Sequence, residues 1–290
     1  MNIAGVRDYL KPANDEQARQ WKPGSAFLAG GTWLYSEPQM TGRITPGQVD
    51  SNDAPGIETI IDLTSLNWDP IQVSESGLEI AATCRIHELL EYQYPSDWHA
   101  CELFENCAKA LSASFKIFNE ATVGGNICMS LPAGSMISMA AALHAEYTIW
   151  PHGEDPIKSS SIDFHRGILD NALGPGDILR SIHLPKAWLK RRVFMDLRSL
   201  THIGRSAALV IATIDDKTRE VEFTFTASVT KPYQIAFKKL PSSGELDVAI
   251  RQAIPKEAYF DDQHGDVFYR ESMSHYLAQQ LRSKIDHGAR

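Results

Sequence analysis

Apolar and polar residues follow two different patterns along the chain, and the pattern changes past residue 185. Before that point, Thr59 to Leu63 and Leu78 to Ala82 are compact apolar runs, which are typical of buried strands. Apolar residues recur at helical spacing from Glu102 to Phe118 and again from Met136 to Tyr147. The first part of the chain is therefore expected to combine short strands with helices.

The C-terminal part predicts a sheet followed by helices. Ser206 to Ile214 is a strand candidate, and Val221 to Val229 alternates apolar residues with polar or small ones, which predicts a strand with one polar face. Asp215 to Thr218 between them is expected to form a hairpin turn. Apolar positions around Ile250 and around Leu277 predict two amphipathic helices. The fold class is therefore α+β.

Two segments interrupt these patterns. Pro38 to Gly56 is rich in Pro, Gly and Asp and is expected to be a long surface loop. Pro185 to Arg192 reads PKAWLKRR and breaks the apolar pattern, so we divide the chain into domains at 1–188 and 189–290. The basic cluster Lys190 to Arg192 is interpreted as a solvated linker face, with steering of a partner as the alternative.

Composition and charge narrow the class of protein. The 290 residues are 43% hydrophobic and 22% charged, which is ordinary for a globular chain. The net charge of −8 disfavours nucleic acid or an anionic membrane as a partner. No apolar run suggests a signal peptide or a membrane span, so a cytoplasmic location is expected. The four cysteines lack metal-binding spacing and are expected to be reduced thiols: Cys84, Cys101, Cys107 and Cys128.

Two glycine pairs carry the candidate chemistry. Phe27 to Thr32 reads FLAGGT and precedes Trp33 and Leu34, and Ala121 to Asn126 reads ATVGGN. Paired glycines let the backbone approach a ligand and point consecutive N–H groups toward it, as a diphosphate requires. Neither segment has the glycine spacing of a Rossmann loop or the Lys-Ser/Thr ending of a nucleoside triphosphatase loop. Each pair by itself also fits a simple tight turn, so the residues alone leave a phosphate-bearing cofactor as one alternative.

Together the two segments resemble the FAD diphosphate loops in the flavin subunit of the molybdenum hydroxylases, the family that includes the FAD domain of xanthine dehydrogenase. Thr59 to Leu63, Ser130 to Ala133 and Gly176 to Pro185 also resemble segments of that family, and the likeness covers nearly the whole chain. The resemblance implies a two-part FAD-binding domain of the vanillyl-alcohol-oxidase (PCMH) type. The resemblance also implies that this domain is followed by a small antiparallel sheet with helices, similar to the C-terminal domain of the carbon monoxide dehydrogenase flavoprotein.

The resemblance also implies the cofactor-binding residues. The first segment would surround the diphosphate and adenosine side, and the second the diphosphate and ribityl side. Ser130 and Pro132 would lie near the flavin, and Leu179 would pack near its ring. The implied FAD site comprises Phe27, Leu28, Ala29, Gly30, Gly31, Thr32, Trp33, Leu34, Ala121, Thr122, Gly124, Gly125, Asn126, Ser130, Pro132, Ser135 and Leu179.

The function implied by the resemblance is electron transfer through bound FAD. Electrons would arrive from a 2Fe–2S small subunit, which serves a molybdopterin-binding large subunit, and would leave to NAD⁺, oxygen or another acceptor. The chain itself contains no cluster ligands and no molybdopterin domain, so other chains would carry both. No catalytic residue or metal site is assigned, because the histidines are scattered and are interpreted as structural or surface groups: His87, His144, His165, His183 and His202.

Three positions depart from the family pattern. Trp33 stands where a small polar residue is common, Ser135 where an Asp is common, and Asp196 where a Lys near the flavin is common. A carboxylate in place of an ammonium near the flavin would lower its potential. These departures motivate a first alternative, a scaffold subunit that has lost its flavin. A second alternative is a stand-alone FAD oxidase of related fold, although the short C-terminal part supplies no large substrate domain.

Overall fold

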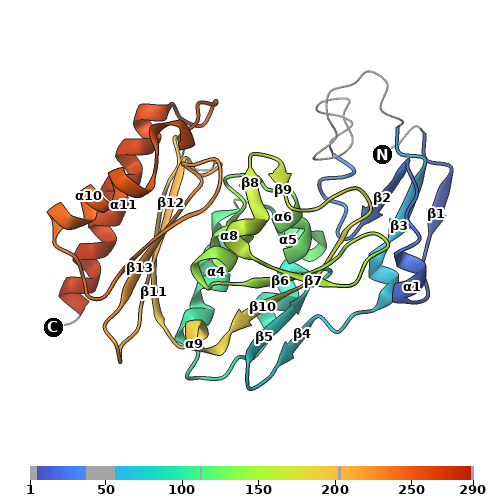
Figure 1. The fold of residues 1–290 in the computed structure, drawn as a ribbon, viewed down its shortest axis with the longest axis horizontal. Helices are drawn as coiled ribbons and strands as arrows, with labels where there is room; N and C mark the ends of the chain where they lie inside the picture. Colours follow the sequence, from blue (N-terminus) through green and yellow to red (C-terminus); the bar gives the residue numbers. More distant parts are fainter. Residues whose placement is uncertain (1–4, 37–55, 112, 202–203, 289–290) are drawn as a thin grey trace.

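The structure is a computed structural model that describes residues 5–36, 56–111, 113–201 and 204–288. Among the described residues, three sheets of three to five strands lie side by side across the molecule, and a fourth has two strands (Figure 1). The predicted loop from Pro38 falls outside the described residues until Gly56, and so does His202. The mixture of helices and antiparallel sheets confirms the α+β class.

The N-terminal sheet is parallel, with the order β1 (Asp8–Leu10), β3 (Thr59–Asp62), β2 (Ser25–Leu28). The short helix α1 (Asp15–Ala18) accompanies it. The central place of β3 explains its continuous apolar run, which is buried on both faces. The predicted strand is confirmed except at its end, where Leu63 begins a 3₁₀ turn capped by the Asp62 carboxylate.

The middle sheet is antiparallel and consists of β4 (Ile71–Val73), β5 (Gly77–Ala81), β10 (Ile178–Pro185), β6 (Glu146–Trp150) and β7 (Ile157–Ser160), in that order. The predicted strand from Leu78 is confirmed as β5. The accompanying elements are α3 (Ile86–Glu91), α4 (Glu102–Ala110), α5 (Phe115–Glu120), α6 (Val123–Cys128), α7 (Ser135–Ala142), α8 (Ser161–Phe164), and the hairpin of β8 (His165–Gly167) and β9 (Asp170–Asn171).

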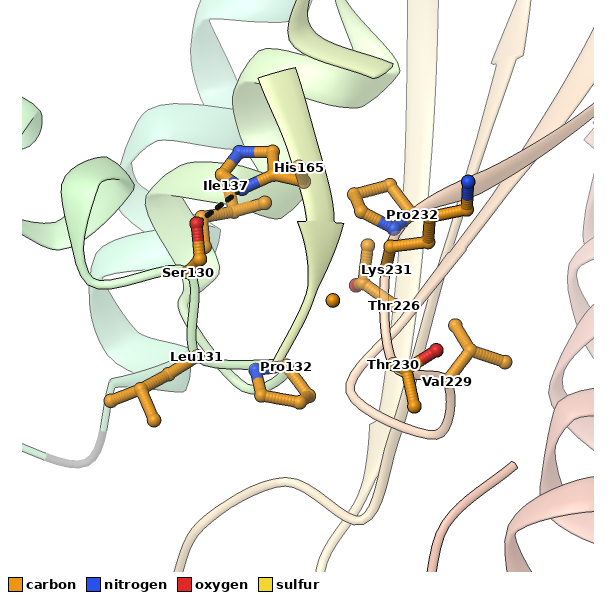
Figure 2. A pocket seen from close by; sticks show the side chains of 11 residues that line it. Ser130, Leu131, Pro132, Ile137, His165, Thr226, Val229, Thr230, Lys231 and Pro232 are labelled. Carbon is orange, nitrogen blue, oxygen red and sulfur yellow. Dashed lines mark hydrogen bonds between the residues drawn. The ribbon is translucent and has the colours of Figure 1, made fainter. Parts of the chain in front are cut away.

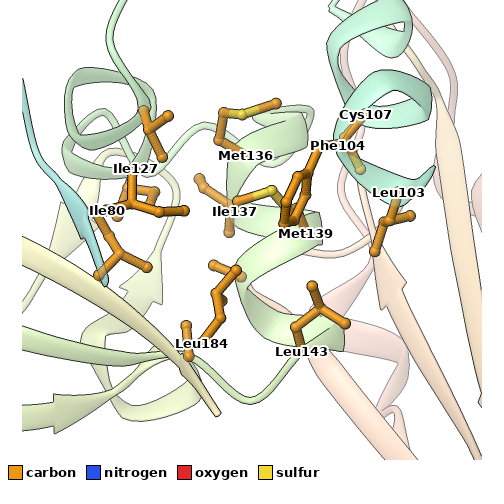
Figure 3. Close-up of a cluster of buried hydrophobic side chains, with 14 of the residues drawn as sticks. Ile80, Leu103, Phe104, Cys107, Ile127, Met136, Ile137, Met139, Leu143 and Leu184 are labelled. Carbon is orange, nitrogen blue, oxygen red and sulfur yellow. The ribbon is translucent and has the colours of Figure 1, made fainter. Parts of the chain in front are cut away.

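The helix α7 forms the centre of the main core. All eight of its residues are buried, and Met136, Ile137 and Met139 contribute to a cluster with β5, β10, α4 and α6 (Figure 3). A helix without a polar face is stable only when it is covered on all sides. The covering comes from the middle sheet, from α4 and from the C-terminal sheet.

Two helix predictions were wrong in extent. The segment from Glu102 to Phe118 forms two helices, α4 and α5, and the second buries none of its residues. Phe115 is 70% exposed, so helical spacing there does not mark a core-facing stripe. The helix predicted from Met136 to Tyr147 stops at Ala142, because His144 has a positive φ and Tyr147 already belongs to β6.

The C-terminal sheet is antiparallel, in the order β11 (Arg192–Arg198), β12 (Ala208–Ile214), β13 (Val221–Thr226), β14 (Tyr233–Phe237). The helices α10 (Ser243–Ala253) and α11 (Val267–Gly288) follow, as predicted. The predicted hairpin turn is confirmed, since the Asp215 carboxylate accepts the N–H of Lys217 at 2.8 Å. The strand β13 stops at Thr226 instead of Val229 because Ala227 has a φ of 64°.

The polar face of β13 is not exposed to solvent. Every residue of the strand is buried, and its polar face lies against α7 and the residues that follow this helix. Thr226 Oγ1 lies 2.7 Å from Ser138 Oγ, and Glu222 Oε1 lies 2.7 Å from His144 Nε2. The alternation therefore marks a polar interface between the C-terminal sheet and the α7 segment, with α10 and α11 covering the opposite face.

The connection between the middle and C-terminal sheets is short and ion-paired. It consists of α9 (Lys186–Leu189) and two further residues before β11. The proposed division at residue 188 falls inside α9, and it stays a prediction. The basic cluster that follows is neutralised by acidic groups: Lys190 by Asp97, Arg191 by Glu220 and Arg192 by Asp216.

Among the helices within the described ranges, none is long and apolar enough to cross a lipid bilayer.

Asp62 stabilises the end of β3, which leads to a prediction. Its carboxylate accepts hydrogen bonds from Tyr9 Oη at 2.8 Å and from the N–H of Thr64 at 2.9 Å. Asp62→Ala is expected to lower the free energy of unfolding by about 1–3 kcal/mol, because it removes a cap and a buried acceptor. Urea unfolding measures this change. The exposed Asp69→Ala is the control, and an equal loss in both variants would contradict the role given to Asp62.

Candidate cofactor site

The first glycine segment leaves β2 as a turn with free donors. Gly31 has a φ of 72°, a conformation that favours glycine. The main-chain N–H groups of residues 30–34 have no acceptor among the residues that the structure describes. The next two, Tyr35 and Ser36, donate back to Gly31 and Trp33. Five successive amides of half-buried residues, without acceptors in the described part of the chain, are donors of the kind that a phosphate group needs.

The second glycine segment is built differently. Its paired glycines lie in the first turn of α6, where Thr122 is the N-cap and its Oγ1 accepts the N–H of Gly125 at 3.0 Å. Gly124 donates to the main-chain oxygen of Ala82, and Asn126 to that of Thr122. These amides are therefore occupied by the protein. The expectation that they offer a second set of free donors is not met in this structure.

The two segments nevertheless meet in space. A Cβ atom on Gly30 would lie 1.8 Å from the main-chain oxygen of Glu120 and 3.0 Å from Cα of Ala121. Only glycine allows this approach between the turn after β2 and the end of α5. The close contact places the free amides of the first segment beside the start of the second.

Two buried polar atoms among the predicted site residues lack partners within the described structure: Nε1 of Trp33, after the first segment, and Oγ of Ser135. Ser135 is completely buried at the first position of α7, whose next amide, that of Met136, donates to Oδ1 of Asn126 at 3.1 Å. A buried polar atom without a partner commonly indicates a missing ligand or water. The amides of the first segment, the indole N–H of Trp33 and the Ser135 hydroxyl, none with a partner among the described residues, fit an anionic, polar cofactor.

Ser130 contacts a buried histidine that sequence reasoning did not connect to it. Ser130 Oγ lies 2.8 Å from His165 Nδ1 (Figure 2). Burial lowers the pKa of His165 to about 3, so its ring stays neutral. Nothing in the spacing of these residues indicated this pair.

A cavity of about 10 Å³ separates Ser130 and Pro132 from Thr226, Thr230 and Lys231 of the C-terminal part (Figure 2). It has room for about one water molecule and not for a flavin ring. A larger open groove of about 910 Å³ lies elsewhere and touches none of the predicted residues. Its lining is strongly acidic, which disfavours a diphosphate: Asp15, Glu16, Glu154 and Asp155.

Two further residues singled out in the sequence, Leu179 and Asp196, lie in different surroundings from one another. Leu179 is buried in the main core, at a bulge where β10 pairs with β6. Asp196 lies on β11, where both of its carboxylate oxygens are 2.8 Å from Nζ of Lys284 on α11. Its neighbours Met195 and Leu197 face the main core instead. The structure gives no support to the expected effect of Asp196 on a flavin, because its charge is paired on the opposite face.

The four cysteines are free thiols, and burial raises the pKa of each, to about 12 for Cys84, Cys101 and Cys128. Such thiols stay protonated and are poor metal ligands. The described residues contain no group of three or more His, Cys, Asp or Glu side chains placed to hold a metal ion.

Comparisons with known proteins identify the family of this chain. Residues 6–187 match the family model described as "FAD binding domain in molybdopterin dehydrogenase", which covers more than half of the chain. The chain belongs to this family of FAD-binding oxidoreductase domains. It is 26% identical to xanthine dehydrogenase 2 from Arabidopsis thaliana over 170 residues. That match covers 56% of this chain but only 12% of the length of the relative.

Solved structures show the same fold over the whole chain. A chain of quinoline 2-oxidoreductase from Pseudomonas putida 86 has a TM-score of 0.78 at 18% identity, covering 100% of this chain and 99% of that chain. A chain of carbon monoxide dehydrogenase from Oligotropha carboxidovorans has a TM-score of 0.77 at 18% identity, covering 97% of each. At this identity the likeness concerns the fold.

Gly30 gives a direct test of the site. Gly30→Val introduces a clash with the backbone at Glu120, and overpacking of this kind costs about 1–3 kcal/mol. We expect FAD affinity to fall about 10- to 100-fold with the fold retained. A smaller effect is expected for Gly125→Val, whose Cβ would meet only Thr122 Oγ1.

Isothermal titration with FAD measures both affinities. Gly244→Val is the matched control, because a Cβ there meets nothing within 4 Å. Unchanged affinity in Gly30→Val would refute the role of the first segment.

His165 predicts a dependence of stability on pH. Below a pH of about 6.5 the unfolded chain takes up a proton on this residue, and the folded chain does so only near pH 3. Stability is therefore lost as the pH falls through this window, by up to about 1.4 kcal/mol per pH unit. His165→Asn should flatten this slope in urea unfolding between pH 7 and pH 4.5. The exposed His99→Asn should keep it, and an unchanged slope in His165→Asn would contradict the assignment.

Proposed function

We propose that the chain is the FAD-carrying electron-transfer subunit of a molybdenum hydroxylase. The single observation that carries this proposal is the row of five amides at residues 30–34 that find no acceptor among the described residues, inside a chain that belongs to the FAD-binding family. A diphosphate is the part of FAD that needs such donors. We further propose that the parallel and antiparallel sheets before residue 188 form a two-part domain of the PCMH type, followed by a separate C-terminal domain from 189 to 290.

The proposed roles follow from the contacts of each residue. The amides of residues 30–34 and the Thr32 hydroxyl bind the diphosphate. Trp33 Nε1 and Ser135 Oγ, which lack partners among the described residues, donate hydrogen bonds to the cofactor. Thr122 and Asn126 act indirectly, since they cap α6 and α7 and so hold the second segment in place. FAD, when bound, supplies redox chemistry, and the protein supplies position and electrostatics.

The proposal includes partner chains. A molybdopterin-binding large subunit and a 2Fe–2S small subunit would deliver the electrons, and NAD⁺, oxygen or another acceptor would receive them. The support is the family description, together with a match to only 12% of the length of xanthine dehydrogenase 2. A relative of that size contains much more than the part resembled here. A cytoplasmic location is part of the same proposal.

Two observations favour a second candidate, a scaffold subunit that has lost its flavin. The amides of the second glycine segment are occupied, and the cavity beside Ser130 holds no more than a water molecule. Under this alternative the free amides would face solvent alone. The two candidates differ in one measurable property, which is the binding of FAD to the purified chain.

The test is to add FAD to the purified chain, remove excess by gel filtration, and record absorbance near 450 nm. We expect about one FAD per chain, because a single donor surface is available for the diphosphate. Addition of small alcohols without partner chains should leave the flavin oxidised, whereas a stand-alone oxidase would reduce it. A colourless protein that retains no FAD would leave only the scaffold candidate.

A further inference from the structure

Arg270 on α11 is among the largest side chains that the described structure buries completely, with 1% exposed. A guanidinium out of water requires acceptors that replace its lost hydration. Nη1 donates to the main-chain oxygens of Ala207 at 2.8 Å and Ala227 at 2.6 Å. Nε donates to the oxygen of Gly265 at 3.0 Å, and Nη2 pairs with Asp262. Most of these acceptors are backbone atoms, so Arg270 fixes the path of the chain around it.

Ala227 is the acceptor with an unusual conformation. It follows β13 with a φ of 64°, in the left-handed region that an alanine seldom adopts, and it is 1% exposed. Such a conformation costs free energy and persists only where surrounding contacts impose it. The contact from Arg270 is on the carbonyl side of Ala227. On the amide side, Ala227 donates a hydrogen bond of 2.8 Å to the main-chain oxygen of Pro132.

Pro132 belongs to the segment between the two helices of the candidate site. Because proline has no N–H, its oxygen is the only main-chain group through which this residue is held by hydrogen bonds. On one side lies Ser130, itself at a φ of 45°, and on the other Gly134, the N-cap of α7. Ser135, with its orphaned hydroxyl, comes next. The left-handed Ala227 thus connects a buried cation on α11 to residues 130–135.

We propose that Arg270 is a positioning residue for the flavin site. By holding Ala227 in its left-handed conformation, it keeps the Ala227 N–H on Pro132 and so fixes the segment that carries Ser130 and Ser135. This inference rests on the proposed function, because it concerns the same FAD site. A purely structural arginine would instead affect the C-terminal helices and sheet without altering the cofactor.

The test variant is Arg270→Lys. Lysine keeps a positive charge beside Asp262, but its compact ammonium lacks the planar fork that reaches several acceptors at once. Ala227→Gly in the Arg270→Lys background is the rescue variant, because glycine adopts a positive φ without the penalty of a Cβ. His275→Ala is the matched control on the same helix, since it removes a contact of 2.9 Å with Asp247 on α10.

Two readouts separate this inference from the proposed function. Hydrogen exchange at the Ala227 amide, followed by NMR in flavin-free protein, reports the link itself. The dissociation constant for FAD and the visible circular dichroism of the bound flavin report its consequence. Arg270→Lys is expected to accelerate exchange at Ala227 and to raise the dissociation constant about tenfold. The rescue variant should recover part of the lost affinity, and His275→Ala should change neither readout beyond its effect on global stability.

The inference is overturned by unchanged exchange at Ala227, by absence of rescue, or by equal losses in Arg270→Lys and His275→Ala. If the unaltered chain binds no FAD, the proposed function fails, and the exchange measurement still decides whether Arg270 holds Pro132. Should Arg270→Lys not fold, Asp262→Asn is the substitute variant. Asp262 is partly exposed, and its replacement weakens the ion pair with Arg270, so this variant is judged by the same two readouts.

Discussion

The burial of α7 between two sheets is the interaction on which the rest of the structure depends. Its eight residues are all buried, so the middle sheet and the C-terminal sheet must both stay in place for the helix to be stable. Polar contacts also join α7 to the C-terminal sheet, as between Ser138 and Thr226. The N-terminus of α7 lies in the proposed flavin site, so the packing that stabilises the molecule also positions Ser135.

A second constraint is the close approach of backbone to backbone at Gly30. This contact aligns a row of free amides with the end of α5, while the amides of the second segment are used to cap α6. The two glycine pairs therefore have different physical roles despite their similar sequences. One provides donors, and the other allows a helix to start against Ala82 and beside its partner segment.

Local patterns of apolar residues predicted several elements correctly. The strands β3, β5 and β12 and the helices α10 and α11 follow directly from apolar spacing. The predictions of burial were wrong where the burial of a residue depends on a segment that is distant in the sequence. Phe115 has helical spacing with α4 yet is exposed on α5, and the polar face of β13 is buried because α7 and the residues after it cover it. The glycine pairs were visible in the sequence, whereas the pair of Ser130 and His165 was not.

The sequence by itself determined the α+β class, the glycine segments and the family to which they belong, because these depend on residues close together in the chain. Only the tertiary structure decided which amides are free, which hydroxyls lack partners, and that Asp196 pairs with Lys284 away from the main core. The physical reason is that hydrogen bonding and burial depend on contacts between distant segments. The same residue type at the same spacing can therefore be a ligand donor in one place and a helix cap in another.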